Sequence, residues 1–136
     1  MTGTHDWALQ KALVTALSAH APLTGLLGGP HLYDRVPPHA ALPYVTLGDG
    51  TWRDWSTGTE SGVEHELRLH VWARDGGRRT IRAIADAIHS CLHDADLALE
   101  SGHLVNLRFV SARILTDPDG RTWHGVLDYR AVTEDI

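Results

Sequence analysis

Two histidines and a cysteine in the stretch HSCLH form the most metal-like pattern in this chain of 136 residues. His89 and His93 are four residues apart, so on a helix they would share one face, and imidazole is a common zinc ligand. Cys91 lies two residues from each histidine, which turns it about 200° around the helix axis and away from both. A zinc site needs three or four ligands that converge on one point. Because basic side chains are also favoured in the last turn of a helix, we interpret the histidines as structural and predict no metal.

Other residues with catalytic potential lack the surroundings that catalysis requires. Ser56 lies in DWSTG, which has no leading glycine of a nucleophile elbow. The stretch GDGTWR lacks the third glycine of a dinucleotide fingerprint. Glu64 and Glu66 share a strand face, but nothing places them in a cleft. We therefore predict no catalytic residue and no cofactor, and expect the protein not to be an enzyme.

The stretch GDGTWRDWSTGTESG, residues 48–62, carries two tryptophans among small and polar residues, although the whole chain has only five. Residues three apart in a strand point to opposite faces, so Trp52 and Trp55 cannot both enter one core. Tryptophan and arginine are enriched at interface hot spots. The alternative is that a turn folds one ring back onto the domain, or that a helix covers the second face. We predict a subunit or partner interface at Trp52, Arg53, Asp54, Trp55 and Trp72, the last because it falls on an otherwise polar strand face.

Arginines cluster in ARDGGRRTIR, which holds Arg74, Arg78, Arg79 and Arg82. The chain as a whole is acidic, with 17 acidic and 12 basic side chains and a net charge of −5. Nucleic-acid-binding proteins usually show the opposite balance. We therefore interpret the arginines as a patch that faces solvent or an acidic protein partner rather than a phosphate site.

The composition is typical of one globular domain, residues 1–136. With 43% hydrophobic residues the chain can build a core, and its single cysteine excludes an intrachain disulfide. It has no signal-like N-terminus and no apolar run near the roughly 18–20 residues that span a bilayer. We expect a soluble protein made in a cytosol.

Hydrophobic periodicity predicts two helices and two hairpins. An amphipathic helix over residues 5–20, with Thr4 or Asp6 as its cap, is expected to stop at Pro22 and to be followed by a turn, LTGLLGGP. A strand over residues 43–52 contains Gly48 and Gly50, which suggest a bulge or a close backbone approach.

The partner of that strand, residues 63–73, alternates apolar and polar side chains, so the two form a long hairpin. Residues 76–95 contain the strongest helical stripe, Ile81, Ile84, Ala85, Ile88 and Leu92. A second hairpin joins residues 104–115 and 121–132 through TDPDG. The predicted fold class is α+β, an antiparallel β-sheet formed by two long hairpins with two main helices packed on one face.

Several stretches together resemble the tail terminator, or tail-completion, proteins of long-tailed phages and gene transfer agents. They are YDRVP, PYVTLGD, DWSTGTESGVEH, HVWAR and DPDGRTWHGVLDYRAVTE, and the resemblance covers nearly the whole chain. It implies a structural virion protein without catalytic residues, assembled in the bacterial cytoplasm and located at the junction of tail and neck. Such proteins form a six-subunit ring that caps the tail tube, stops its elongation and joins it to the head–neck connector. The implied partners are copies of the chain, the tube protein and a neck protein, with DNA only in transit through the ring and no membrane.

Three other functions remain open from the sequence alone. One is another connector or stopper ring between head and tail. Another is a small metal-dependent enzyme that uses His89, His93 and an acidic residue. The last is a ligand-binding α+β module that dimerises through its sheet.

Overall fold

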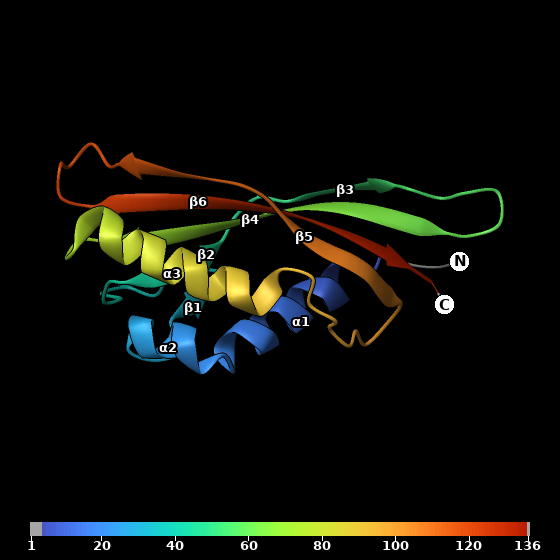
Figure 1. Ribbon diagram of the computed structural model, residues 1–136, viewed down its shortest axis with the longest axis horizontal. Helices are drawn as coiled ribbons and strands as arrows, with labels where there is room; N and C mark the ends of the chain where they lie inside the picture. Colours follow the sequence, from blue (N-terminus) through green and yellow to red (C-terminus); the bar gives the residue numbers. More distant parts are fainter. Residues whose placement is uncertain (1–3, 136) are drawn as a thin grey trace.

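A computed structural model describes residues 4–135 of the chain, which form one mixed sheet with helices on one of its faces (Figure 1). Within these residues there are three helices, α1 (Asp6–Ser18), α2 (Ala21–Leu27) and α3 (Gly77–Leu92). The six strands are β1 (Leu32–Tyr33), β2 (Tyr44–Leu47), β3 (Thr51–Asp54), β4 (Gly62–Ala73), β5 (His103–Thr116) and β6 (Trp123–Glu134). The predicted α+β class is confirmed.

The sheet has the order β1-β2-β4-β6-β5, and β3 pairs with β4 beyond the end of β2. All pairs are antiparallel except β1 with β2, a short parallel pair that the sequence did not predict. β5 and β6 form the second predicted hairpin, and Gly120 in its turn has a φ of 70°, as expected for a glycine at this point.

The first predicted hairpin is interrupted on its N-terminal side. Gly48 and Gly50 lie at the break between β2 and β3, and the backbone passes close to β4 there, as the glycines predicted. A Cβ at Gly48 would lie 2.5 Å from Nε2 of His70, and one at Gly50 would lie 3.1 Å from the carbonyl oxygen of Glu66. Any larger residue at position 48 would have to displace the His70 ring.

The N-terminal helical segment differs from the prediction. α1 ends at Ser18, and Pro22 lies in the first turn of α2 instead of terminating a helix, so the predicted turn over LTGLLGGP is wrong. Proline is tolerated there because the first backbone N–H groups of a helix have no intrahelical partner. The N-cap position of α1 belongs to His5 and not to Thr4 or Asp6, and the His5 side chain makes no capping hydrogen bond. The Thr4 hydroxyl accepts from the backbone N–H of Asp6 at 3.3 Å, and the Asp6 carboxylate lies 3.2 Å from Nδ1 of His65.

The core lies between the helices and the sheet. The odd-numbered residues of β4 and β6 face the helices, and the predicted stripe of α3 is buried except for Ala85, which is half-buried. The largest fully buried side chains include Leu9, Leu17, Leu23, Ile81, Ile84, Ile88, Leu92 and Tyr129. No helix within residues 4–135 is long and apolar enough to cross a membrane. The face of the sheet away from the helices remains uncovered (Figure 1).

Candidate assembly surface

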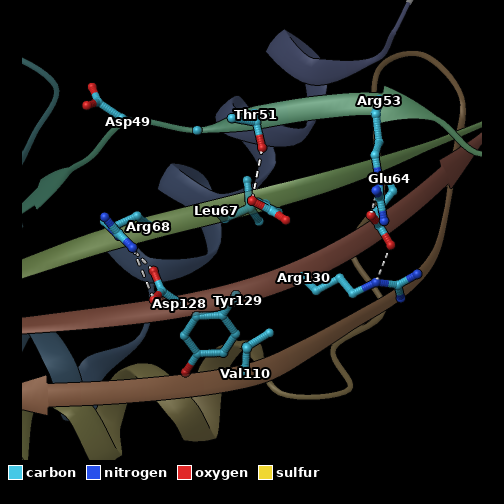
Figure 2. Close-up of a pocket in the computed structure, with 12 residues that line it drawn as sticks. Asp49, Thr51, Arg53, Glu64, Leu67, Arg68, Val110, Asp128, Tyr129 and Arg130 are labelled. Atoms are coloured by element: carbon cyan, nitrogen blue, oxygen red, sulfur yellow. Dashed lines mark hydrogen bonds and ion pairs between the residues drawn. The ribbon is translucent and has the colours of Figure 1, made fainter.

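The uncovered sheet face, hereafter the open face, carries the even-numbered side chains of β4 and β6. Most of them are polar, although Val126 and Val132 of β6 are apolar and buried. The central part of the open face is a shallow groove of about 520 Å³ (Figure 2). The polar side chains that line the groove are Asp49, Thr51, Arg53, Glu64, Glu66, Arg68, Asp128 and Arg130. Most of these charges are paired across neighbouring strands, so the groove is a network of ion pairs rather than a set of free groups.

Glu64 is the centre of this network, and its side chain is only 5% exposed. One carboxylate oxygen accepts from Nε of Arg53 at 2.5 Å and the other from Nε of Arg130 at 2.6 Å. The hydrogen bond from Arg53 is the main reason why the pKa of Glu64 lies below its ordinary value. The two guanidinium groups approach the ring of Trp55, with 5.9 Å from Arg53 and 5.0 Å from Arg130 to the ring centroid. Trp55 is thereby held on the open face.

A second ion pair crosses from β4 to β6 farther along the groove. Nε and Nη2 of Arg68 donate to the two carboxylate oxygens of Asp128 at 2.8 and 3.3 Å, which is a bidentate geometry. The hydrogen bond from Arg68 lowers the pKa of Asp128. These pairs fix the relative positions of β4 and β6 on the open face.

The far end of the open face carries an aromatic cluster. Trp72 stacks on His124 with ring centroids 3.8 Å apart, and Nδ1 of His70 lies 2.6 Å from Nε2 of His124. The Trp72 indole N–H donates to the hydroxyl of Thr46 at 3.2 Å. Burial lowers the pKa of both histidines. Trp72 is therefore half-buried within its own sheet, on the polar face where the sequence placed it.

Trp52 lies on the opposite side of the sheet from Trp55. It is paired with His65, whose side chain faces the helices, and Asp54 projects on the same side two residues later. The exposed fractions are 51% for Trp52 and 49% for Trp55. The prediction that the two rings lie on different faces is confirmed, and neither ring is folded into the core.

The arginine cluster lies at the other end of β4 from these two tryptophans (Figure 1). Nε of Arg74 donates to the hydroxyl of Thr122 at 3.1 Å, and its guanidinium lies 3.8 Å from Asp119. The guanidinium of Arg78 lies 5.0 Å from the ring centroid of Trp123. Arg79 and Arg82 are exposed on the first turns of α3. The predicted interface residues thus form two separate groups and not one patch.

The histidines of HSCLH are occupied with local contacts. The rings of His89 and His93 stack with centroids 4.7 Å apart, and Nδ1 of His93 accepts from the backbone N–H of Phe109 at 3.1 Å. Burial raises the pKa of the Cys91 thiol. Among residues 4–135, no group of three or more histidine, cysteine, aspartate or glutamate side chains is placed to hold a metal ion.

Sequence reasoning missed an exposed apolar edge along β5. Val105, Phe109, Val110 and Leu115 are all exposed, and shifts in the pairing with β6 occur at Val105 and Val110. Trp7 at the start of α1 was also missed and is 63% exposed. The signal for the β5 edge was present, because LVNLRFVSARIL places adjacent apolar residues where a regular strand would alternate.

Comparison with known proteins gives consistent matches over most of the chain. The family model described as tail completion protein gp17 matches residues 11–134. The tail completion protein gp17 of Bacillus phage SPP1 is 32% identical over 127 residues, which covers 90% of each protein.

Two solved structures are also similar to this chain in their fold. A chain in the virion of a native gene transfer agent particle superposes with a TM-score of 0.87 at 36% identity, over 94% of this chain and 96% of that one. The structure of SPP1 gp17 gives a TM-score of 0.59 at 26% identity, over 92% and 88% of the two chains. The chain therefore belongs to the gp17 family of tail completion proteins.

Proposed function

We propose that this protein forms a ring of six copies that caps the finished tail tube, stops its elongation and joins the tail to the neck. The observation that carries this proposal is the likeness to a chain of a gene transfer agent virion, with a TM-score of 0.87 over 94% of this chain. That chain is part of an assembled virion, and its fold matches this one over almost the full length. The likeness therefore supports a structural role in a particle.

The distribution of exposed side chains supports a ring. Residues 51–55 and the β5 edge lie on opposite edges of the sheet, and both expose large apolar side chains. Contacts between two different surfaces of identical copies are heterologous, and such contacts close into rings when the rotation between copies divides a full turn. A two-fold dimer would instead bury one self-complementary patch.

We include in this proposal the interface residues predicted from the sequence. Residues 52–55 and Trp72 contact a neighbouring copy or an adjoining ring, and the arginines meet an acidic protein surface. Arg79 and Arg82 form no ion pair among the described residues, so their charges are available to a partner.

The net charge of −5 fits a channel through which DNA passes in transit. A ring built from chains with a net negative charge repels the phosphate backbone, which reduces adhesion of the DNA during delivery.

Removal of the gene from a producing strain tests the proposal. Electron microscopy of the lysate should show tail tubes much longer than in complete particles, together with heads that carry no tails, and a plasmid copy should restore normal particles. Tails of normal length that fail to attach would instead identify a stopper ring on the head side. Complete and infectious particles without the protein would contradict the proposal.

A further inference from the structure

A second groove lies beside the β5 edge on the helix side of the sheet, hereafter the α3–β5 groove. Its volume is about 460 Å³. The apolar side chains that line it include Ile81 and Ala85 from α3 and Phe109, Ala112 and Ile114 from β5. Arg78, Arg82 and Arg113 line it as well, against one carboxylate, that of Asp86, so the charge around the groove is positive.

The α3–β5 groove also contains a polar group without a partner. Tyr129 lines it and is only 2% exposed, yet its hydroxyl has no hydrogen-bond partner within residues 4–135. Its ring extends from β6 toward β5 (Figure 2). Buried hydroxyl groups are nearly always hydrogen-bonded. A polar group that enters the groove could therefore supply the hydrogen-bond partner that the Tyr129 hydroxyl lacks within the described residues.

The form of β5 favours side-chain docking over the addition of a strand. Pairing with β6 shifts between Leu104 and Asn106 and again between Phe109 and Ser111. Bulges twist an edge strand and interrupt its row of backbone groups, which makes it a poor template for another strand. A partner at this edge is therefore expected to insert a side chain into the groove.

The opposite edge of the same molecule carries a suitable side chain. Trp52 and Asp54 project from β3 on the helix side, which is also the side of the α3–β5 groove. The Trp52 ring is half exposed, and Asp54 forms no ion pair among the described residues. An indole offers a large apolar surface and one N–H donor, which matches an apolar groove that holds an unpaired hydroxyl.

We propose that Trp52 of one copy inserts into the α3–β5 groove of the next copy, with Asp54 beside it paired to Arg82 at the rim. The two surfaces lie on opposite edges of the sheet, so the contact is head-to-tail and its repetition generates a ring rather than a closed dimer. This inference rests on the proposed ring function and names the side chains that would hold the ring together. Trp55, on the open face, takes no part in this contact.

The aromatic part of the proposal is tested with purified full-length protein mixed with tail tubes from particles that lack it. The fraction of tube ends that carry a ring is counted by electron microscopy. Trp52→Ala should reduce ring formation at least about tenfold at a fixed protein concentration, as expected for a central aromatic anchor. Trp7→Ala removes an equally large exposed ring at the start of α1, outside both surfaces of this contact, and should have a much smaller effect. Equal effects of the two substitutions would overturn the proposal.

The charge pair is tested by exchanging its signs. Asp54→Arg and Arg82→Asp should each impair ring formation, and the variant with both changes should recover it, because each copy supplies one surface to each neighbour. Asp34→Arg and Arg35→Asp are matched controls at exposed positions without an ion pair in the described part of the chain. Failure of the double variant to recover would contradict the pairing.

A cross-link between positions 54 and 82 of neighbouring copies tests the contact directly, without a variant that must lose function. Asp54→Cys and Arg82→Cys are combined in a Cys91→Ala background and treated after assembly on tubes with a short bismaleimide cross-linker, because the backbones of an Asp–Arg pair lie farther apart than a disulfide spans. A ladder of covalent oligomers is expected, and its absence from assembled rings would overturn the docking. If wild-type protein formed no rings on tubes at all, the proposed function itself would fail; rings in wild type and Trp52→Ala alike would refute only the docking.

Discussion

Glu64 shows how a single buried charge organises the surface of this protein. A carboxylate removed from water is stable only with strong compensating partners, and Glu64 has two guanidinium groups within hydrogen-bonding distance. These partners come from β3 and β6, so one side chain joins three strands. The same guanidinium groups hold the ring of Trp55, which links a charge inside the sheet to a side chain available at the surface.

Replacement of Glu64 by glutamine should lower the free energy of unfolding at pH 7 by about 1–3 kcal/mol, since hydrogen bonds to charged groups contribute on this scale. The pKa of Glu64 is lowered in the folded state, so its stabilising effect is present above the ordinary value of 4.5 and is lost as pH falls through the folded pKa. The difference between wild type and Glu64→Gln should therefore shrink below about pH 4.5. Urea denaturation at several pH values measures it.

Glu66→Gln is the matched control for this prediction, because Glu66 lies on the same face and strand but is exposed. Its effect at pH 7 should be within about 0.5 kcal/mol. A Glu64→Gln variant as stable as wild type at pH 7 would show that the two arginines do not need this carboxylate.

At the scale of single residues, the sequence predicted which face of the sheet a side chain occupies better than it predicted which residues that side chain contacts. The three-residue spacing of Trp52 and Trp55 was enough to place them on opposite faces. The partners of Glu64 were not predictable, because Arg130 is 66 residues away and meets it only through the register between β4 and β6. The α3–β5 groove was missed because it is formed by the packing of α3 against β5, and no pattern within either element reveals that packing.

At the scale of elements, the packing of α3 on the sheet depends on a glycine in β6. A Cβ at Gly125 would lie 2.7 Å from Cγ2 of Ile81 and 3.5 Å from Cβ of Val71. Both neighbours are almost fully buried, so neither can move freely. Gly125 therefore allows α3 to approach the middle of the sheet.

Gly125→Ala should lower the free energy of unfolding by about 1–3 kcal/mol, the usual cost of overpacking a core. Gly58→Ala is the control, because no atom lies within 4 Å of the added Cβ at that position. Thermal and urea denaturation of both variants measure the effect. A Gly125→Ala variant with the stability of Gly58→Ala would contradict the packing argument.

Elements with a long periodic pattern were predicted and short ones were not. The alternation of β4 and the helical stripe of α3 each continue long enough to determine the element from the sequence. α2 has 7 residues and β1 has 2, which is too short for either period to develop. The proline in α2 added to the error, since proline both ends helices and begins them.

At the scale of the whole molecule, the sheet separates two kinds of surface. One edge presents β3 and its exposed tryptophan, and the other presents β5 and the groove beside α3. The open face between them is dominated by ion pairs that are satisfied within the chain. Contacts between copies are therefore expected at the edges. The family was evident from the sequence, whereas the division of the surface required the structure.

Cryo-electron microscopy of purified protein mixed with tail tubes tests the central claim most directly. We predict a six-fold ring at one end of each tube, with no growth from capped ends when further tube protein is added. Tubes that continue to grow in the presence of excess protein, with density for the chain absent from their ends, would contradict the account.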